Sequence, residues 1–364
     1  MASSVAISNR EASSPGPTTA QGSERIHAAL EKITHPARVS HPVVAAGIAS
    51  WLAFSLLTAL VENSDKVPMR ELGPLQSAEP ATIALGVLVA VVWAVLWVLA
   101  ARPGRTGAWA HAKVSHGGKW LLGSGLWAFA WELTTAKTAV LKPPYLSSPQ
   151  SIINRLWEHR VILSESLGNS LSLLAVGFAV GLIAGLVTGV VIGWWQAANY
   201  WVHPILIFIG PVPALAWVPI VFVLAPSAYA GAVFMIALSV WFPITVLTRA
   251  GILSAPRSYF DVAQTLGAGS WFLVLRVSLP AALPSIFTGA FMALGSSFVT
   301  LTVAENFGVN SGLGWYLNWQ KSFGDYPAVY AGIVVLVLVC GLLLTLLFRT
   351  RNWVLRWEKG LTRW

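Results

Sequence analysis

Charged residues are scarce in this sequence. Of its 364 residues only 10% are Asp, Glu, Lys or Arg, whereas 56% are hydrophobic, and the mean hydropathy is +0.68. Soluble domains carry about 25% charged residues, and a globule this apolar would expose more hydrophobic surface than a soluble monomer tolerates. The scarcity of charge therefore excludes an ordinary soluble domain and indicates a chain whose solvent is the lipid bilayer.

The sequence has one cysteine, Cys340, which excludes an intramolecular disulfide and a Cys-based metal site. Its seven histidines fall in the N-terminal tail, in loops or at the ends of apolar runs. No Gly-x-x-x-x-Gly-Lys-[Ser/Thr] loop for ATP phosphates occurs. We therefore expect no catalytic residue, metal or cofactor in this chain, and no enzyme activity.

The few charges are mostly basic, with a formal net charge of +9. Lys and Arg lie at the ends of the apolar runs rather than on one soluble face, which is typical of cytoplasmic loops and lipid headgroup contacts. The 19 Trp residues fit anchoring at the membrane interface. Membrane lipids, and not nucleic acid, are therefore the expected partners of the basic charge.

Runs of about 20 apolar residues predict transmembrane helices. Two stand apart near the N-terminus, at Val43–Val61 and Ala81–Ala101. Six more follow, at Gly118–Thr135, Gly168–Trp194, Pro204–Ala225, Tyr229–Arg249, Leu283–Ala304 and Ala328–Phe348. We expect an all-α polytopic membrane protein, with a six-helix core at residues 118–348 preceded by two additional helices within residues 43–117.

The two ends of the chain are polar. Residues 1–42 run directly into a long apolar segment, which is not the pattern of a cleavable signal peptide. We expect disorder to about Ser23, a short helix at Glu24–Ile33, and a basic tail at residues 349–364. Most of the 23 Lys and Arg residues fall on the side that holds both termini. The positive-inside rule therefore predicts that both termini are cytoplasmic.

The loop between the third and fourth expected spans has its own pattern. Pro143-Pro144 stops a helix, and Ser148-Pro149 then supplies an N-cap and a proline in the first turn. Apolar residues follow at helical spacing, at Ile152, Ile153, Leu156 and Trp157. These features predict a short amphipathic helix on the outer membrane surface.

The second core span carries glycine at every fourth position: Gly177, Gly181, Gly185, Gly189 and Gly193. Such spacing lets membrane helices approach closely, and we interpret the stripe as helix packing without chemistry. A four-residue step drifts about 40° per repeat. The stripe is therefore expected to wind around its helix and meet more than one neighbour.

The third core span is interrupted by prolines. Pro211, Pro213 and Pro219 break its hydrogen-bond ladder, with Trp217 among them. Transporters place broken helices at solute sites, where freed backbone groups bind the solute. The segment is either such a part of the translocation pathway or a structural kink, and the pattern does not decide between them.

Acidic residues within membrane spans are rare and often functional. Glu305 and Asn306 follow the fifth core span, ahead of Gly308 and Ser311–Gly314. The carboxylate is expected either to orient a neighbouring helix or to line an outer gate of the pathway. An interfacial residue in water is the remaining alternative.

The segment between the fourth and fifth core spans, about residues 255–282, is too polar to cross the membrane. Its residues Asp261–Gly267 predict a helix with a glycine break, and Val277–Pro280 and Ala281–Pro284 predict a second amphipathic helix with a proline stop before the next span. The pattern is typical of an element that docks on a cytoplasmic partner.

This segment resembles the Glu-Ala-Ala…Gly…Leu-Pro loop of ABC importer permeases, within the nitrate/sulfonate/taurine/bicarbonate group. The broken helix, the glycine stripe, Val303–Glu305 with Ser311–Gly314, and Ser148-Pro149 occur in the order of that group, over about residues 118–364. The resemblance implies ATPase coupling through Asp261, Ala263, Gly267, Leu279 and Pro280. Three stretches depart from the group: Asp261-Val262 replaces Glu-Ala, Leu173 stands where arginine is usual, and Ala225-Pro226-Ser227 replaces Trp-Phe-Gly.

The resemblance further implies a bacterial inner-membrane complex. In it, two permease subunits, here two copies of this chain, lie on two cytoplasmic ATPase subunits that hold ATP and Mg. A periplasmic or lipid-anchored binding protein delivers a small solute, typically an anion such as a sulfonate, taurine, nitrate or bicarbonate. The solute then passes by alternating access. The departures at Leu173 and at Ala225–Ser227 leave the identity of the solute open.

Two other functions are alternatives. An ion-coupled secondary transporter would show paired ionisable residues deep in its spans and inverted repeats, and neither is visible. An intramembrane enzyme would need a nucleophile and a base, or a metal constellation, facing a cavity. The histidine positions give no such constellation.

Overall fold

The computed structural model describes residues 40–64, 75–210 and 212–357. Most of the two tails, the expected helix at Glu24–Ile33, and Pro211 lie outside these residues. The chain divides into two compact units, residues 1–64 with 79–139, and residues 65–78 with 140–364. Helices make up both units, and no strand occurs in the described ranges. The prediction of an all-α polytopic membrane protein is confirmed.

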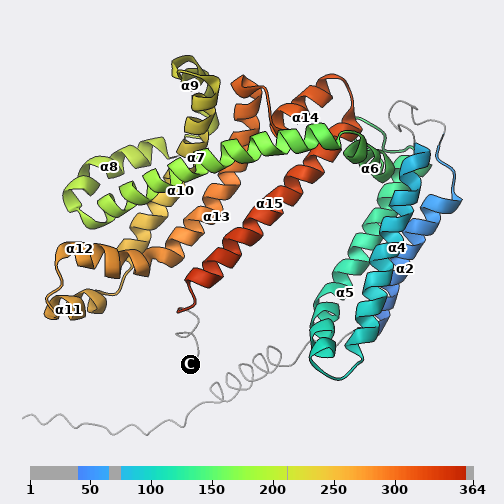
Figure 1. Ribbon diagram of the computed structural model, residues 1–364, viewed down its shortest axis with the longest axis horizontal. Coiled ribbons are helices and arrows are strands. Elements are labelled where there is room, and N and C mark those ends of the chain that lie inside the picture. The colour runs from blue at the N-terminus through green and yellow to red at the C-terminus, as the bar shows by residue number, and fades with distance from the viewer. Residues whose placement is uncertain (1–39, 65–74, 211, 358–364) are drawn as a thin grey trace, which may run out of the picture. The chain divides into compact units, whose positions relative to one another are not determined.

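The first unit consists of three long helices that run alongside one another (Figure 1). They are α2 (His41–Leu60), α4 (Leu75–Ala100, in this unit from Glu79 on) and α5 (Arg105–Glu132), and a π-helical turn η1 (Leu133–Lys137) extends α5. The ammonium group of Lys137 donates to the carbonyl oxygens of Thr58 (3.2 Å) and Val61 (2.5 Å), and lies 3.7 Å from Glu132. The last turn of α2, whose carbonyls lack helical partners, is therefore capped by a buried lysine from η1.

Helix α5 contains most of the expected span Gly118–Thr135, which was predicted to belong to the six-helix core. Here it belongs to the same compact unit as α2 and α4. Gly47 of α2 lies so close to α5 that an added Cβ would be 2.9 Å from the Leu121 side chain. This close approach and the lysine cap account for the grouping. The division of the chain into extra helices and core at residue 117 stays a prediction.

The second unit contains the remaining helices. In chain order they are α6 (Pro149–Glu158), α7 (Arg160–Trp194), α8 (Gln196–Ile209), η2 (Ala214–Trp217), α9 (Val218–Leu224), α10 (Ala228–Leu253), α11 (Arg257–Thr265), α12 (Ser270–Phe272), η3 (Leu273–Ser278), α13 (Leu279–Ala304), η4 (Glu305–Val309), α14 (Leu313–Ser322) and α15 (Tyr326–Val354). Buried residues of α7, α10 and α13 form its main core. Figure 1 shows α11 and α12 at one end of these long helices, with α6 and α14 at the other.

Within the described residues, six helices are long and apolar enough to cross a membrane, or seven if the bent pair α8 and η2–α9 is one span. The two halves of that pair meet at 87°. The sequence predicts eight spans, and the one that fails this criterion is Gly118–Thr135 in α5. That helix is long enough, but Trp, Gly and charged residues make it less apolar than the other six.

The glycine stripe of α7 lies against one helix, α10, and not against several. A Cβ added at Gly181 would be 2.5 Å from the carbonyl oxygen of Ala237, and one at Gly185 would be 2.7 Å from the Cβ of Ile244. The neighbours along the stripe on α10 are Ile236, Ala237 with Val240, Ile244, Thr248 and Ile252. The expectation of several neighbours was wrong because α10 repeats its contacts with the same four-residue step, so the two stripes wind around each other.

The predicted helix after Pro143-Pro144 is confirmed as α6. The hydroxyl oxygen of its N-cap, Ser148, accepts a hydrogen bond from the N–H of Ser151, and Pro149 occupies the first turn. Its apolar face is only partly covered, because Ile152 is buried whereas Trp157 is 70% exposed.

A polar network fixes α6 to the starts of α15 and α14. Nε of Arg155 donates to a carboxylate oxygen of Asp325 at 3.2 Å, and Asp325 in turn caps α15. Nδ1 of His159 lies 2.7 Å from the hydroxyl of buried Tyr316. Burial lowers the pKa of His159 and raises that of Tyr316. The imidazole is therefore held in its neutral form against the hydroxyl group.

Candidate functional site

The segment between α10 and α13 projects beyond the ends of the long helices. Helix α11 ends in a Schellman motif, in which the N–H of Ala268 donates to the carbonyl of Ala263 (3.0 Å) and the N–H of Gly267 to that of Gln264 (2.9 Å). Gly267 has φ +82°, a conformation that favours glycine. The predicted glycine break therefore has a definite geometry. Asp261 is exposed in the middle of α11 and does not cap it, since Pro256 is the N-cap.

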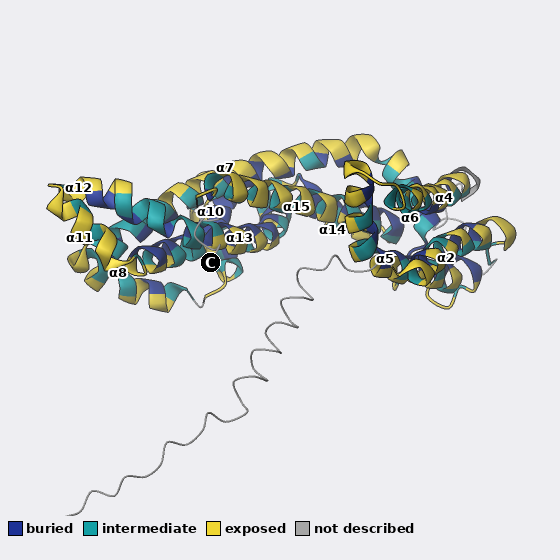
Figure 2. Cartoon of the chain, turned by 90° about the horizontal axis from the view of Figure 1, so that it is seen from below, coloured by how far each residue is buried: buried dark blue, intermediate teal, exposed yellow. Residues whose placement is uncertain are grey.

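The projecting segment carries exposed apolar side chains. Val262 is 60% exposed, Leu266 83% and Trp271 68%. Tyr259 and Phe272 are also more than half exposed, and Figure 2 shows exposed residues along α11 and at the start of α12. A surface of this kind is typical of a contact with another protein.

The predicted stop at Leu279-Pro280 is wrong. Helices α12, η3 and α13 follow one another without a break, and Ser270–Val309 reads as one span of 40 residues. Pro280 lies in the first turn of α13, directly after the wider π-helical turn η3. Proline lacks an N–H and its ring clashes with the carbonyl four residues earlier. The π-helical turn changes which backbone N–H and carbonyl groups pair with each other just before Pro280. The helix therefore continues past the proline.

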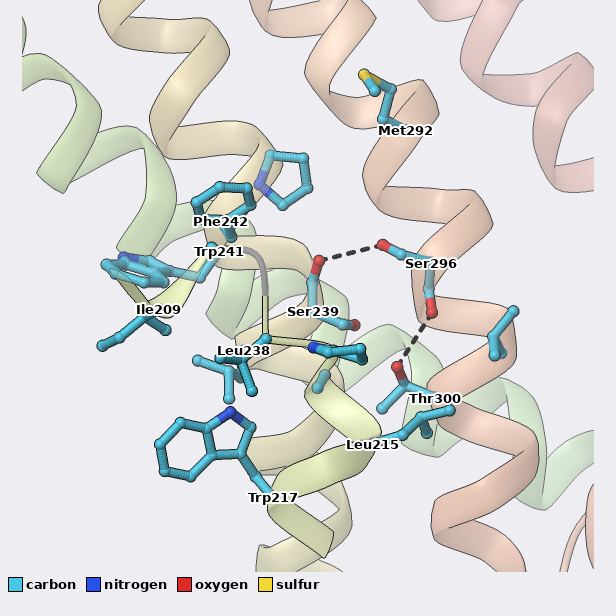
Figure 3. Close-up of a pocket in the computed structure, with 16 residues that line it drawn as sticks. Ile209, Leu215, Trp217, Leu238, Ser239, Trp241, Phe242, Met292, Ser296 and Thr300 are labelled. Carbon is cyan, nitrogen blue, oxygen red and sulfur yellow. Dashed lines mark hydrogen bonds between the residues drawn. The ribbon is translucent and has the colours of Figure 1, made fainter. Parts of the chain in front are cut away.

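A cavity of about 440 Å³ opens beside the broken helix (Figure 3). Its walls come from the end of α8, from Val212 and Pro213, from η2, and from the middle of α10 and α13. Of the expected pathway residues, Pro213 and Trp217 line it, whereas Pro219, Glu305 and Asn306 do not. Pro211 lies outside the described residues.

The polar groups of this cavity are few. Ser239, Ser296 and Thr300 line it, and each hydroxyl donates to a backbone carbonyl, so that Ser296 reaches Ser239 and Thr300 reaches Ser296, both at 3.1 Å. The indole N–H of Trp241 donates to Thr188 Oγ1 at 3.0 Å. Among the described residues, none accepts a hydrogen bond from the buried indole nitrogen of Trp217.

Glu305 is part of a helix cap and not of the cavity wall. The residue is 1% exposed, and its two carboxyl oxygens accept from the hydroxyl of Ser170 (2.5 Å) and the N–H of Gly314 (2.6 Å). Ser170 Oγ in turn accepts from the N–H of Leu313 at 2.8 Å. The carboxyl group therefore closes the N-terminus of α14, where acidic groups stabilise a helix.

The residues around Glu305 leave it no room to move. Gly312 has φ +101°, and a Cβ there would collide with the carboxyl group. A Cβ at Gly314 would be 2.6 Å from the carbonyl of Thr302. Asn306 stays beside this cap, because its amide donates to the carbonyls of Thr302 (2.7 Å) and Gly314 (3.2 Å). Glu305 was expected either to orient a neighbouring helix or to line an outer gate. Its contacts with the N-terminus of α14 fit the first of these roles.

Sequence reasoning missed Ser170 and the hydroxyl groups of the cavity. Ser170 lies on α7, far from Glu305 in sequence, and no local pattern links them. Ser239, Ser296 and Thr300 look like ordinary small residues of packed membrane helices. Their shared position becomes visible only when α10 and α13 are seen side by side.

Comparison with known proteins places the chain in a family. Residues 160–356 match the model for the binding-protein-dependent transport system inner membrane component. A formylaminopyrimidine transport permease of Halalkalibacterium halodurans is 29% identical over 63% of this chain and 91% of its own length. The taurine transport system permease of Escherichia coli is 27% identical over 58% and 79%, and a bicarbonate transport system permease of Synechococcus elongatus is 32% identical over 52% and 66%.

The resemblance that the motifs indicated is thereby confirmed, and the chain is a transport component and not an enzyme. The matched segment begins at α7 and ends in the residues after α15, so it takes in the glycine stripe, the broken helix, the projecting segment and the cap at Glu305. Because the match covers more than half of its residues, this chain belongs to the family of binding-protein-dependent transport system inner membrane components, as a multi-pass membrane protein.

Proposed function

We propose that the chain is the permease subunit of an ATP-driven importer in a bacterial inner membrane, with both termini in the cytoplasm. It moves a small solute such as a sulfonate, taurine, nitrate or bicarbonate by alternating access. The names of its relatives support a small solute, since they include bicarbonate, taurine and formylaminopyrimidine transport. The distribution of Lys and Arg supports the orientation.

The working complex contains two copies of this chain, two ATPase subunits and a periplasmic or lipid-anchored binding protein. ATP and Mg are held by the ATPase subunits, because this chain has no phosphate-binding loop of its own. Family membership supports ATPase and binding-protein partners. The pairing of identical copies follows the commonest symmetry of soluble oligomers.

The observation that carries this proposal is the exposed apolar surface of the projecting segment. Val262, Leu266 and Trp271 would be costly to leave in water, yet the segment is held in a fixed form by the Schellman motif at Gly267. It also joins α10 to α13, the two helices that form cavity walls. Docking of an ATPase subunit here covers the apolar surface. Movement of the ATPase subunit is then transmitted through the rigid segment to α10 and α13.

The test replaces Leu266 by Asp in the full-length chain produced together with its ATPase and binding protein. Leu266 is 83% exposed, so the substitution leaves the fold intact but places a charge in the docking surface. We expect normal membrane insertion, loss of ATPase co-purification and loss of uptake. Gly269→Ala is the matched control, because Gly269 has φ −76° and open space around it.

Gly267→Pro tests the geometry of the same segment. Proline fixes φ near −65° and lacks the N–H that donates to Gln264, so the end of α11 must change. We expect weakened ATPase association with normal insertion. Wild-type association and uptake in both Leu266→Asp and Gly267→Pro would refute the coupling role.

A further inference from the structure

The corner between α7 and α8, residues 194–196, packs against the projecting segment. The ring centroids of Trp195 and of Trp271 in α12 are 5.8 Å apart, with the two planes at 68°. Those of Trp194 and of Phe260 in α11 are 6.0 Å apart. Figure 1 shows this corner at the same end of the long helices as α11 and α12. Both short helices of the projecting segment are therefore in ring contact with a part of the chain that is distant in sequence.

A hydrogen bond adds a third contact at the start of α8. Nε of Arg249, near the end of α10, donates to Oδ1 of Asn199 at 2.9 Å. Hydrogen bonds with a charged donor are shorter and stronger than neutral ones. The first turn of α8 is thereby joined to α10, the helix that leads into the projecting segment.

Helix α8 has little else to fix its position. Leu206 is its one buried residue, whereas Trp201 is 73% and Phe208 79% exposed. At its far end, Gly210 lies so close to α10 that an added Cβ would be 2.2 Å from the ring of Phe242. An element with few buried contacts is among the parts of a protein that move most readily. The position of α8 is therefore set by its two ends, and the corner determines the first of them.

The order of the helices along the chain makes this corner a direct route to α8. Helices α10 and α13 are joined to the projecting segment through the backbone, so both follow a displacement of it. The end of α8 lines the same cavity as α10 and α13. Its start, however, follows α7, and the chain reaches the projecting segment only after α9 and α10. Movement of the segment reaches the start of α8 directly only through the contacts at the corner.

We propose that Trp195 is a positioning residue that transmits movement of the projecting segment to α8, and that Trp194 and Asn199 act with it. When the ATPase subunits displace the segment, the first half of the broken helix then moves together with α10 and α13. This inference rests on the proposed function, because the ATPase subunits supply the movement. Trp271 is still 68% exposed beside Trp195, so the docking surface remains available to the ATPase.

Aromatic pairs suit this task. Edge-to-face rings have a preferred geometry, and a tryptophan has few side-chain torsions that could absorb a displacement. Tryptophans at a membrane interface also anchor helices to lipid headgroups. Trp201 pairs with Tyr200 of the same helix, with 5.3 Å between ring centroids. An anchoring role alone treats Trp195 and Trp201 alike, whereas a transmitting role separates them, so Trp201 is the matched control.

The test measures movement of α8 in the full-length chain, assembled with its partners in membrane vesicles. A nitroxide spin label is attached at Phe208→Cys in the Cys340→Ala background, and double electron–electron resonance gives the distance between the labels of the two copies. This distance is compared without nucleotide and with ADP and vanadate, which trap the ATPase in its closed state. The same measurement at Leu253→Cys, at the end of α10, reports movement of the projecting segment itself. Leu253 and Phe208 are 60% and 79% exposed, so both accept a label.

Trp195→Ala is expected to reduce the nucleotide-driven change at position 208 to less than about half, while the change at position 253 is kept. Adding Asn199→Ala removes the acceptor of Arg249 and should reduce the change at position 208 further. Co-purification of the ATPase should stay normal. Trp195→Phe keeps an aromatic ring and is expected to restore the change, and Trp201→Ala should leave it unaltered.

Other results would overturn the inference in distinguishable ways. An undiminished change at position 208 in the Trp195→Ala/Asn199→Ala protein, with movement at position 253, overturns it while the proposed function stands. An equal loss in Trp195→Ala and Trp201→Ala overturns it and assigns Trp195 to anchoring. Loss of ATPase co-purification in Trp195→Ala overturns it as well, since Trp195 then belongs to the docking surface. Absence of movement at both positions with an intact corner and bound ATPase overturns the inference and the coupling role of the segment together.

Discussion

Gly181→Ala is the most direct perturbation of the packing between α7 and α10. The added Cβ would lie 2.5 Å from the carbonyl oxygen of Ala237 and 2.9 Å from its Cα, and both are backbone atoms. Ordinary contact begins near 3.4 Å, so α10 must retreat locally by about 0.9 Å. A side-chain rotation cannot relieve this contact, because the clash is with the main chain.

The expected cost combines two opposing effects. Overpacking of a tight contact costs about 1–3 kcal/mol, and replacing glycine by alanine inside a helix returns about 0.5–1 kcal/mol. Because the clash is with backbone atoms, the overpacking cost lies in the upper part of that range, about 2–3 kcal/mol. The net loss of unfolding free energy is then about 1–2.5 kcal/mol, which for a unit of this size lowers Tm by about 2–10 °C. The assay is thermal unfolding of the purified full-length chain in detergent.

Gly168→Ala on the same helix is the control. Gly168 is exposed, and a Cβ there would meet nothing within 4 Å. This variant should be as stable as the unmodified chain or slightly more stable. A Gly181→Ala protein that unfolds at the same temperature as Gly168→Ala would show that α7 and α10 are not packed as closely as the structure has them.

Three further predictions concern polar groups outside the cavity. Glu305→Ala should lower the unfolding free energy by about 2 kcal/mol or more, because the hydroxyl of Ser170 and the N–H of Gly314 lose their acceptor inside the protein, at about 1–3 kcal/mol each. Chemical denaturation measures this, and a change below about 1 kcal/mol would contradict the cap. Burial lowers the pKa of His159, so the unfolded state binds the proton more readily, and stability present above pH 6.5 is lost as the pH falls through the folded-state pKa. Hydrogen exchange around His159 and Tyr316 should then rise on acidification, but not in His159→Gln. Lys137→Met should destabilise the first unit by about 3–5 kcal/mol, since it removes one partner of a buried ion pair and the donor to the carbonyls of Thr58 and Val61; differential scanning calorimetry that finds no change would refute the lysine cap.

Local features were predictable because their causes are local. Ser148-Pro149 marks the start of α6 because a hydroxyl cap and a first-turn proline act within a few residues. The break at Gly267 follows from the need for positive φ at the end of a helix. The predicted helix end at Leu279-Pro280 was wrong because proline alone does not decide where a helix ends. The π-helical turn before it changes which carbonyls are available for hydrogen bonds.

Features that depend on a second helix were not predictable. The stripe from Gly177 to Gly193 identified a close contact, but its partner was hidden in the four-residue step of α10, where Ile236 and Ile252 look like ordinary apolar residues. In the same way, the end of α5 meets α2 through Lys137, whose acceptors are backbone carbonyls and carry no sequence signal.

Glu305 shows why an acidic residue at the end of a span is a weak indicator of a solute path. A buried carboxyl group is stabilised by whatever donors reach it, and here the donors are a serine hydroxyl and the N–H of Gly314 at a helix start. The signal was present in the sequence as glycines at 312 and 314, which make room for the carboxyl group. With this acid assigned to the cap, the polar side chains among the described residues that line the cavity are Ser239, Ser296, Thr300 and two tryptophans, so the carboxyl group and the cavity are separate features of the chain.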